Sequence, residues 1–384
     1  MITDRGTLPG RILLRLNMGN GVLFPKRKEE SFVKRLLALL FCVTFLFCLA
    51  GCGESVELPN TPSTEKESVI IELDPSVERK FLATDITNHS IVVYDLNRCG
   101  GDFEKLKDDD TSIIWEWDAD EDGNCKLAKR VGAGIDSAKY RYSGCYKRDV
   151  IIACSSSGWA GVIDYKTETV IWEYNIGKGP HSIEMLPNGD VVVACSSDPG
   201  ALVYVPLSAG IQAPVSSIPS LYCHGVGWDP QNECLWVLED TGVYAAVIEN
   251  MGTANGKLVR LSGSGGSVGT GGHAFSPIYG EPGHYWASNG GSLYRFNSET
   301  EEVLFRYDRS SVLSTGSIKG IASFPDGTVV QSVAGIGGKD TRGWSCDGFR
   351  IITKGAEKDI VTVVLFEPSH REFYKVQPFT KDYQ

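Results

Sequence analysis

Short apolar runs separated by turns recur along most of the chain. One example is the apolar stretch 182–186, which is followed by the turn Pro187-Asn188-Gly189 and then by a second apolar run, 191–195. An Asn-Gly pair between two apolar runs is typical of a β-hairpin, because glycine adopts positive φ without steric cost. We therefore predict short strands joined by hairpins. No segment of this region has a convincing helical period.

These hairpins form an internal repeat of six strand–turn–strand segments, 81–96, 150–167, 191–207, 234–250, 284–299 and 329–353. Flanking strands are predicted at 113–117, 165–174 and 296–307 after units, and at 182–186, 225–228 and 321–324 before units. Four antiparallel strands in each unit of roughly 50 residues predict an all-β fold, a six-bladed β-propeller, since one blade cannot bury both its faces. Residues 69–73 either begin the first blade or complete the last.

The residue that leads into the innermost strand of each blade defines a candidate site. These residues are Lys139, His181, His224, His273 and Lys319, whereas the first blade has Ser68 at this position. Innermost strands line the channel of a propeller, so we expect these side chains to form a ring at one mouth. The loops between second and third strands add further side chains to the same face, namely His89, Trp159, Asn289, Arg342 and Trp344.

A cationic, partly aromatic mouth is suited to an anion such as a carboxylate, sulfate or phosphate, with tryptophan faces for a sugar or another ring. Clustered like charges lower the pKa values of lysine and histidine, so the histidines are expected to titrate near neutral pH. Two interpretations stay open beside this one. The ring is either a polar lining that binds only water and backbone, or a metal site, although its histidines come from different blades.

The N-terminal part has the pattern of an export signal. Residues 36–50 carry no charge and follow Lys34 and Arg35, as in a secretory signal peptide. The run ends in Leu49-Ala50-Gly51-Cys52, which resembles the bacterial lipobox, where the signal is cleaved before the cysteine and the cysteine is lipidated. An uncleaved membrane anchor is the alternative, but these fifteen residues are short for a span of about 20 residues.

We therefore expect residues 1–51 to be a cleaved signal peptide with an upstream extension. Residues 52–68 would be a flexible tether lipidated on Cys52, and residues 69–384 the propeller domain. From Cys52 onward the chain holds 45 acidic and 29 basic residues, which argues against nucleic acid as a partner. The expected location is the cell envelope, with the protein, a monomer, anchored by lipid to the periplasmic or surface face of a bacterial membrane.

Other candidate chemistry is weaker. Asp118, Asp120 and Asp122 fit the start of a calcium loop, but position twelve is Lys129 where a bidentate glutamate is required. No two cysteines have the close spacing of a zinc site, and no cofactor is expected. Cys99 with Cys125 is a candidate disulfide in an exported protein.

The sequence resembles uncharacterised bacterial lipoproteins with a six-bladed propeller. More distantly it is similar to quinoprotein and arylsulfotransferase-type propellers, through the Trp-rich strand 113–117 and the "H…LPNG" hairpin from His181 to Gly189. This resemblance covers roughly 69–379 and implies the fold rather than an activity. We expect a membrane-anchored, non-catalytic protein that binds an anionic or carbohydrate-like ligand, or an envelope protein, at the channel mouth. The alternative is a lyase or hydrolase of acidic saccharides at this site, with a histidine as general base.

Overall fold

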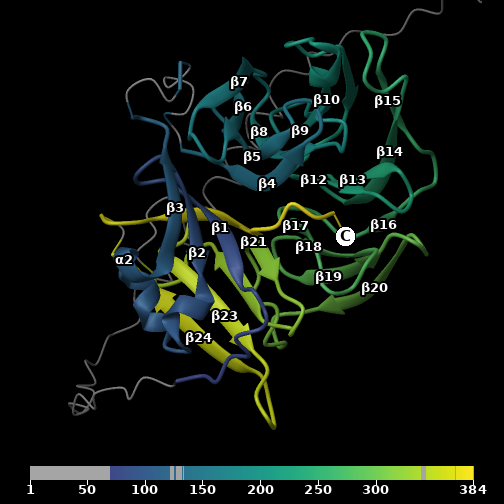
Figure 1. Cartoon of the computed structure of the whole chain (residues 1–384). Coiled ribbons are helices and arrows are strands. Elements are labelled where there is room, and N and C mark those ends of the chain that lie inside the picture. The colour runs from purple at the N-terminus through teal and green to yellow at the C-terminus, as the bar shows by residue number, and fades with distance from the viewer. Residues whose placement is uncertain are drawn as a thin grey trace, which may run out of the picture. The chain divides into compact units, whose positions relative to one another are not determined.

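Six antiparallel sheets contain nearly all of the regular structure and are arranged around one axis (Figure 1). The computed structural model describes residues 70–121, 125–126, 132, 134–338, 343–367 and 369–383, all within the unit Glu67–Gln384. The predicted signal peptide, the tether with Cys52, and the candidates Asp122 and Arg342 lie outside the described residues. The predicted all-β fold of six four-stranded blades is confirmed.

In the first three blades the strands follow one another from the axis outward. Blade 1 contains β25 (Phe373–Pro378), β1 (Lys80–Asp85), β2 (Ser90–Asp95) and β3 (Ile113–Asp118). Blade 2 contains β4 (Ser137–Ser143), β5 (Arg148–Cys154), β6 (Trp159–Asp164) and β7 (Val170–Asn175). Blade 3 contains β8 (Pro180–Met185), β9 (Val191–Cys195), β10 (Ala201–Val205) and β11 (Ser216–Pro219).

The other three blades have the same order. Blade 4 contains β12 (Gly225–Asp229), β13 (Cys234–Leu238), β14 (Gly242–Glu249) and β15 (Lys257–Arg260), with β16 (Gly266–Ser267) also paired to β14. Blade 5 contains β17 (Phe275–Pro277), β18 (His284–Ser288), β19 (Leu293–Asn297) and β20 (Glu302–Tyr307). Blade 6 contains β21 (Ile318–Ser323), β22 (Val329–Val333), β23 (Gly348–Thr353) and β24 (Ile360–Leu365).

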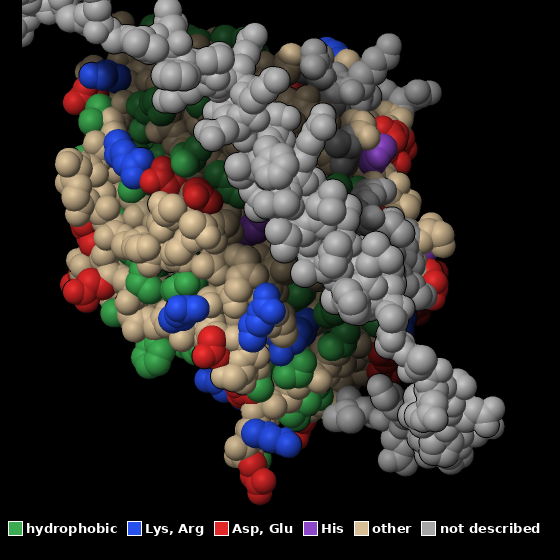
Figure 2. All heavy atoms as spheres, turned by 180° about the vertical axis from the view of Figure 1, so that it is seen from behind, with side chains coloured by type: hydrophobic (Ala, Val, Ile, Leu, Met, Phe, Trp, Pro, Cys, Tyr) green, Lys and Arg blue, Asp and Glu red, His purple; other side chains and the backbone are tan. Residues whose placement is uncertain are grey.

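Helical structure is confined to single turns in the described residues. These turns are η1 (Leu96–Cys99), η2 (Phe103–Lys107), α2 (Asp109–Ser112) and η4 (Leu207–Ala209). None of the described helices has the length and apolar character that a membrane span requires. On the face shown in Figure 2, acidic, basic and hydrophobic side chains are interspersed over the described surface.

Strand β25 closes the ring. It comes from the C-terminal part of the chain and pairs antiparallel with β1, so that Val376 lies opposite Ala83. The six inner strands then contact one another in a complete cycle, β25–β4–β8–β12–β17–β21 and back to β25. Both sequence-based expectations for residues 69–73 were wrong, because residues 70–73 form no strand and Ile71 packs in the cluster that includes side chains of η1 and η2.

The core consists of the interfaces between blades. Each of six hydrophobic clusters combines buried side chains of two neighbouring blades, and together the clusters connect all six blades in a ring. Trp117 of β3, for example, stacks on Trp159 of β6 with ring centroids 6.1 Å apart. Each blade therefore buries both its faces only when both neighbours are present.

The cysteines take part in these interfaces. Cys99 and Cys125 form no disulfide with each other, so the predicted Cys99–Cys125 disulfide is wrong. Cys99 packs between blades 1 and 6, whereas Cys125 packs between blades 1 and 2, so different interfaces hold the two thiols apart. Cys154 and Cys195 are fully buried in the interface of blades 2 and 3.

The role of β25 gives a first prediction. Val376 is fully buried between blades 1 and 6, so Val376→Asp places a carboxylate where it has no water. We expect this variant to lose about 3 kcal/mol of unfolding free energy in urea titrations. Val363→Asp, on the edge strand β24 where Val363 is 41% exposed, should change stability by less than about 0.5 kcal/mol. Equal stabilities of the two variants would contradict closure by β25.

Candidate functional site

Four consecutive blades direct a basic side chain to one mouth of the channel. His181 lies in β8 and Lys319 in β21, whereas His224 directly precedes β12 and His273 lies two residues before β17. The pairing of β8 with β9 shifts register at His181, and that of β21 with β22 shifts at Lys319. Such a bulge re-aims one side chain out of the regular alternation, which turns these residues toward the mouth.

The three histidines form a line. The ring centroids of His181 and His224 are 4.4 Å apart, and those of His224 and His273 are 4.7 Å apart, in edge-to-face geometry. Lys319 continues the line, because its Nζ donates to His273 Nε2 at 3.0 Å. Four of the five positions predicted for the ring are thus in contact along one line. We call these four residues, with Lys375, the basic cluster.

A repeated backbone feature positions these side chains. The residue two positions before each of the four has a positive φ, namely Gly179 (59°), Tyr222 (52°), Gly271 (80°) and Ser317 (54°). In two blades the carbonyl of that residue faces the imidazole, with Gly179 O 3.0 Å from His181 Nδ1 and Tyr222 O 2.9 Å from His224 Nδ1. A carbonyl only accepts, so these contacts favour the tautomer with the proton on Nδ1 in both rings, although the Ser196 hydroxyl also lies 2.8 Å from His181 Nδ1.

Lys375 is the member of the candidate site that sequence reasoning missed. It lies in β25, and its buried Nζ donates to the carbonyls of His181 at 2.7 Å and His224 at 2.9 Å. Its neighbour Tyr374 lies 6.2 Å from His181, measured between ring centroids. Ser68 was predicted for this blade because β25 was not recognised as its inner strand.

The electrostatics keep the imidazoles neutral near pH 7. Burial lowers the pKa of His273 to about 3, with further lowering by Lys319 and Lys375. The pKa of His224 is well below its usual value because of burial and then of the neighbouring histidines. Burial also lowers the pKa of Lys375 to about 8. The positive charge of the basic cluster at neutral pH therefore resides on the two lysines.

One carboxylate faces His181 from blade 2. Asp136 Oδ1 lies 3.6 Å from His181 Nε2, and its other oxygen accepts from the Ser156 backbone amide. Burial raises the pKa of Asp136, and burial lowers that of His181. Burial therefore disfavours the charged form of each group, both the Asp136 carboxylate and the His181 imidazolium. An added anion would stabilise the imidazolium and so raise the pKa of His181.

Lys139 lies elsewhere than the ring prediction placed it. Its Nζ donates to Glu184 Oε2 at 2.9 Å and to Val226 O at 2.6 Å, deep between the inner strands. Arg141 contacts the same carboxylate, with Nε 2.8 Å from Oε1. The physical reason is that β4 pairs with β5 without a bulge, so Lys139 lies further along its strand than His181 does in β8.

Trp159 also differs from its predicted position. It is fully buried, and its Nε1 donates to Glu173 Oε2 at 3.1 Å. Its ring folds back over Gly161, where a Cβ would lie only 2.3 Å from the indole. The glycine thus leaves the space that draws Trp159 into the core, out of reach of a ligand.

Of the remaining candidates, Trp344 lies beside the basic cluster, whereas His89 contacts one of the acidic residues proposed for calcium. Trp344 is 37% exposed and packs edge-on against Tyr374 at 5.5 Å, beside the basic cluster. His89 lies in the β1–β2 turn, where its Nδ1 is 2.8 Å from Asp120 Oδ2. Asp120 also receives a turn contact, since its backbone amide donates to Asp118 Oδ1. Among the described residues no group of three or more side chains has the arrangement to hold a metal ion.

The residues that follow β25 cross the opposite end of the axis (Figure 1). Phe379 stacks on Tyr140 at 4.2 Å, Lys381 pairs with Asp149, and the Tyr383 hydroxyl donates to Met185 O at 2.6 Å. Together with the buried Lys139–Glu184–Arg141 group, these residues fill the axis beneath the basic cluster. The end of the channel away from the basic cluster is therefore closed.

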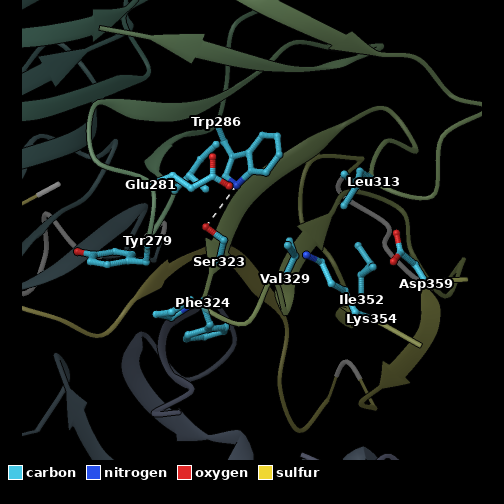
Figure 3. Close-up of a pocket in the computed structure, with 14 residues that line it drawn as sticks. Tyr279, Glu281, Trp286, Leu313, Ser323, Phe324, Val329, Ile352, Lys354 and Asp359 are labelled. Atoms are coloured by element: carbon cyan, nitrogen blue, oxygen red, sulfur yellow. Dashed lines mark hydrogen bonds between the residues drawn. The ribbon is translucent and has the colours of Figure 1, made fainter. Parts of the chain in front are cut away.

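A separate pocket of about 180 Å³ lies between blades 5 and 6, at the other ends of β17 and β21 (Figure 3). Its wall includes Trp286, whose Nε1 donates to Ser323 Oγ at 3.3 Å. Glu281, Lys354 and Asp359 line it as well. It shares no lining residue with the basic cluster.

Fold and site together define a six-bladed β-propeller with a basic mouth and a closed far end. The chain belongs to a family of unknown function, DUF6528, whose model matches residues 78–336. No curated protein matches the sequence.

Solved structures are similar to this chain at low identity. A chain of a nidogen/laminin complex is 9% identical, with 79% of this chain and 99% of that chain covered at a TM-score of 0.50. Hydrazine synthase of Kuenenia stuttgartiensis is 14% identical over 73% and 82% of the two chains, with a TM-score of 0.46. A functionally unknown protein of Desulfotomaculum acetoxidans is 12% identical over 74% and 78%, with a TM-score of 0.44.

The buried ion group gives a second prediction. Glu184 is 1% exposed and is the carboxylate shared by Lys139 and Arg141. Glu184→Gln leaves two cations buried without their counter-charge, so we expect a loss of about 3 kcal/mol of unfolding free energy. Glu249→Gln is the matched control, because its pair with Lys257 is exposed and spans 4.0 Å. Urea unfolding measures both, and a neutral Glu184→Gln would show that this group does not hold the axis together.

Proposed function

We propose that this protein binds an anionic or carbohydrate-like ligand at the basic mouth of its channel. The observation that carries the proposal is the convergence of five basic side chains, from five of the six blades, on one small region. The positive charges of Lys319 and Lys375 repel each other, and a bound anion would offset this repulsion by attracting both. A buried site also strengthens each charge-assisted hydrogen bond that the anion makes.

The neutral imidazoles suit such a ligand. Each histidine has a low pKa in the free protein because protonation would add a buried charge beside lysines. An anion placed beside these rings reverses this penalty and favours the protonated imidazole. Ligand binding would therefore be coupled to proton uptake. The histidines would become protonated hydrogen-bond donors only when the anion is bound.

The third prediction tests this linkage. Sulfate stays dianionic between pH 5.5 and 8, whereas the histidines gain protons more readily as pH falls and Lys375, with a pKa of about 8, loses charge as pH rises. Affinity for sulfate should therefore increase as pH decreases from 8 to 5.5. Calorimetry in two buffers of different ionisation enthalpy measures affinity and proton uptake together.

Variants make this test specific. At pH 5.5 His273→Gln should weaken sulfate binding about tenfold, equivalent to one lost charge-assisted hydrogen bond. His284→Gln is the matched control, because His284 contacts Asn297 and the Pro282 carbonyl on β18, away from the basic cluster. An affinity independent of pH, with no proton uptake, would contradict the proposed site.

An enzymatic role at the same mouth is the second candidate. His181 Nδ1 lies 2.8 Å from Ser196 Oγ while Nε2 faces Asp136, and these are groups used in hydrolytic sites. The Gly179 carbonyl, however, favours a proton on Nδ1, and a protonated Nδ1 cannot also accept the serine proton. This supports binding over hydrolysis. Turnover of an acidic saccharide that disappears in His181→Gln would favour the lyase or hydrolase instead.

We further propose that the protein is exported and held by lipid on Cys52 in the cell envelope, where an envelope protein is the other candidate partner of the mouth. The support is the apolar run 36–50 and the lipobox-like Leu49-Ala50-Gly51-Cys52. In a bacterial host, Cys52→Ala should abolish incorporation of labelled fatty acid and move the protein from the membrane to the soluble fraction. Unchanged labelling and fractionation in this variant would contradict lipidation at Cys52.

A further inference from the structure

Exposed aromatic side chains flank the line of histidines on two sides. Tyr222 is 40% exposed, and its ring lies 4.2 Å from His224 and 6.1 Å from His273. On the other side, Trp344 is 37% exposed against Tyr374, which lies beside His181. A protein gains nothing in stability from leaving two such rings in water, and exposed aromatic rings beside polar donors are typical of ligand sites.

The burial of the basic cluster limits what can reach it. Lys375 Nζ lies beneath the histidines and is held by the carbonyls of His181 in β8 and of His224 before β12. Below it, the Lys139–Glu184–Arg141 group and the segment 379–383 fill the axis. A polymer therefore cannot thread through the channel. His224, Lys319 and Lys375 are only 2%, 8% and 3% exposed, so only a small molecule or the free end of a chain reaches the basic cluster.

The exposed aromatic rings and the buried basic donors together favour one class of ligand. An inorganic anion satisfies the donors and leaves the aromatic rings unused, whereas a neutral sugar does the reverse. An open-chain acid has a carboxylate but no rigid ring face to lie on an indole. A sugar ring that carries a carboxylate satisfies both, since its C–H face packs on an aromatic ring while its carboxylate accepts from Nε2 and Nζ donors.

We propose that the ligand is an acidic monosaccharide, or the terminal acidic sugar of a chain. Its carboxylate meets the basic cluster and its ring packs on Trp344. This inference rests on the proposed function, and it adds the ring, the aromatic contact and the requirement for a free end.

Calorimetry with four probes tests the ring. Sodium sulfate supplies the anion alone, glucose the ring alone, gluconate an open-chain acid and glucuronate both features. Glucuronate should bind at least about tenfold more tightly than each of the other three. Trp344→Ala should weaken glucuronate binding about tenfold and sulfate binding less than about twofold, because only the sugar uses the indole. Phe305→Ala, on the outer strand β20 where Phe305 is 63% exposed, is the matched control and should change neither.

Oligomers of galacturonate test the free end. For terminal binding, the affinity per chain should be the same for the dimer, the tetramer and the octamer. An affinity that rises in proportion to chain length would overturn the requirement for an end, because internal residues would then bind.

The outcomes separate the two levels of the proposal. If sulfate and glucuronate both fail to bind, the proposed anion function is wrong, and this inference fails with it. If sulfate binds in a pH-dependent manner but glucuronate binds no more tightly and Trp344→Ala has no effect, the anion function stands and the acidic-sugar assignment is overturned.

Discussion

The pairing of β25 with β1 is the interaction on which the rest of this molecule depends. A propeller blade has two apolar faces, and each is buried only by a neighbouring blade, so an open ring would leave two faces in water. Here the C-terminal strand is the inner strand of the N-terminal blade, and blade 1 is complete only when both parts of the chain are present. The same strand brings Lys375 to the axis, beside carbonyls from blades 3 and 4. Closure of the fold and completion of the candidate site are thus one event.

The axis of the propeller separates two kinds of buried charge. Toward the closed end, Glu184 neutralises Lys139 and Arg141 within hydrogen-bonding distance, which is the arrangement expected of a structural ion group. Toward the basic mouth, the Lys375 ammonium is held by carbonyl oxygens, which carry only partial charges. The first arrangement balances its two cations with a carboxylate that both contact, whereas at the mouth the Asp136 carboxylate faces His181 and dipoles hold the Lys375 ammonium. This contrast between the two ends of one channel favours the mouth as the end that receives an anion.

The sequence predicted the architecture well because each hairpin is encoded locally. Gly189, for example, has φ of 96°, and a Cβ at that position would lie 2.6 Å from Cys145, so the turn admits glycine and little else. Apolar alternation and such turns give the six hairpins and several inner strands. Strand β25 has no comparable local pattern that identifies its partner, because its pairing with β1 is between distant parts of the chain. Lys375 was missed for that reason alone.

The candidate site was predictable only where the repeat is regular. The three histidines and Lys319 occupy equivalent positions, and alignment of the repeats found them. The position of Lys139 was predicted wrongly because the sequence of β4 does not indicate whether the strand contains a bulge. Trp159 was misplaced because its burial depends on the missing side chain of Gly161, two positions along the same strand. The positive φ two residues before each position was partly legible, as glycine at 179 and 271, but not at Tyr222 or Ser317.

The place of β25 near the C-terminus has a consequence for protein synthesis. Residues 70–338 contain every histidine of the basic cluster, but a nascent chain that ends at 338 has no inner strand for blade 1 and no lysine from β25 at the axis. The chain must emerge from the ribosome through β25, which ends at Pro378, before the mouth takes its final form. The strands that carry His181 and Lys319 are therefore synthesised well before the strand that completes the ring and brings Lys375 to the axis.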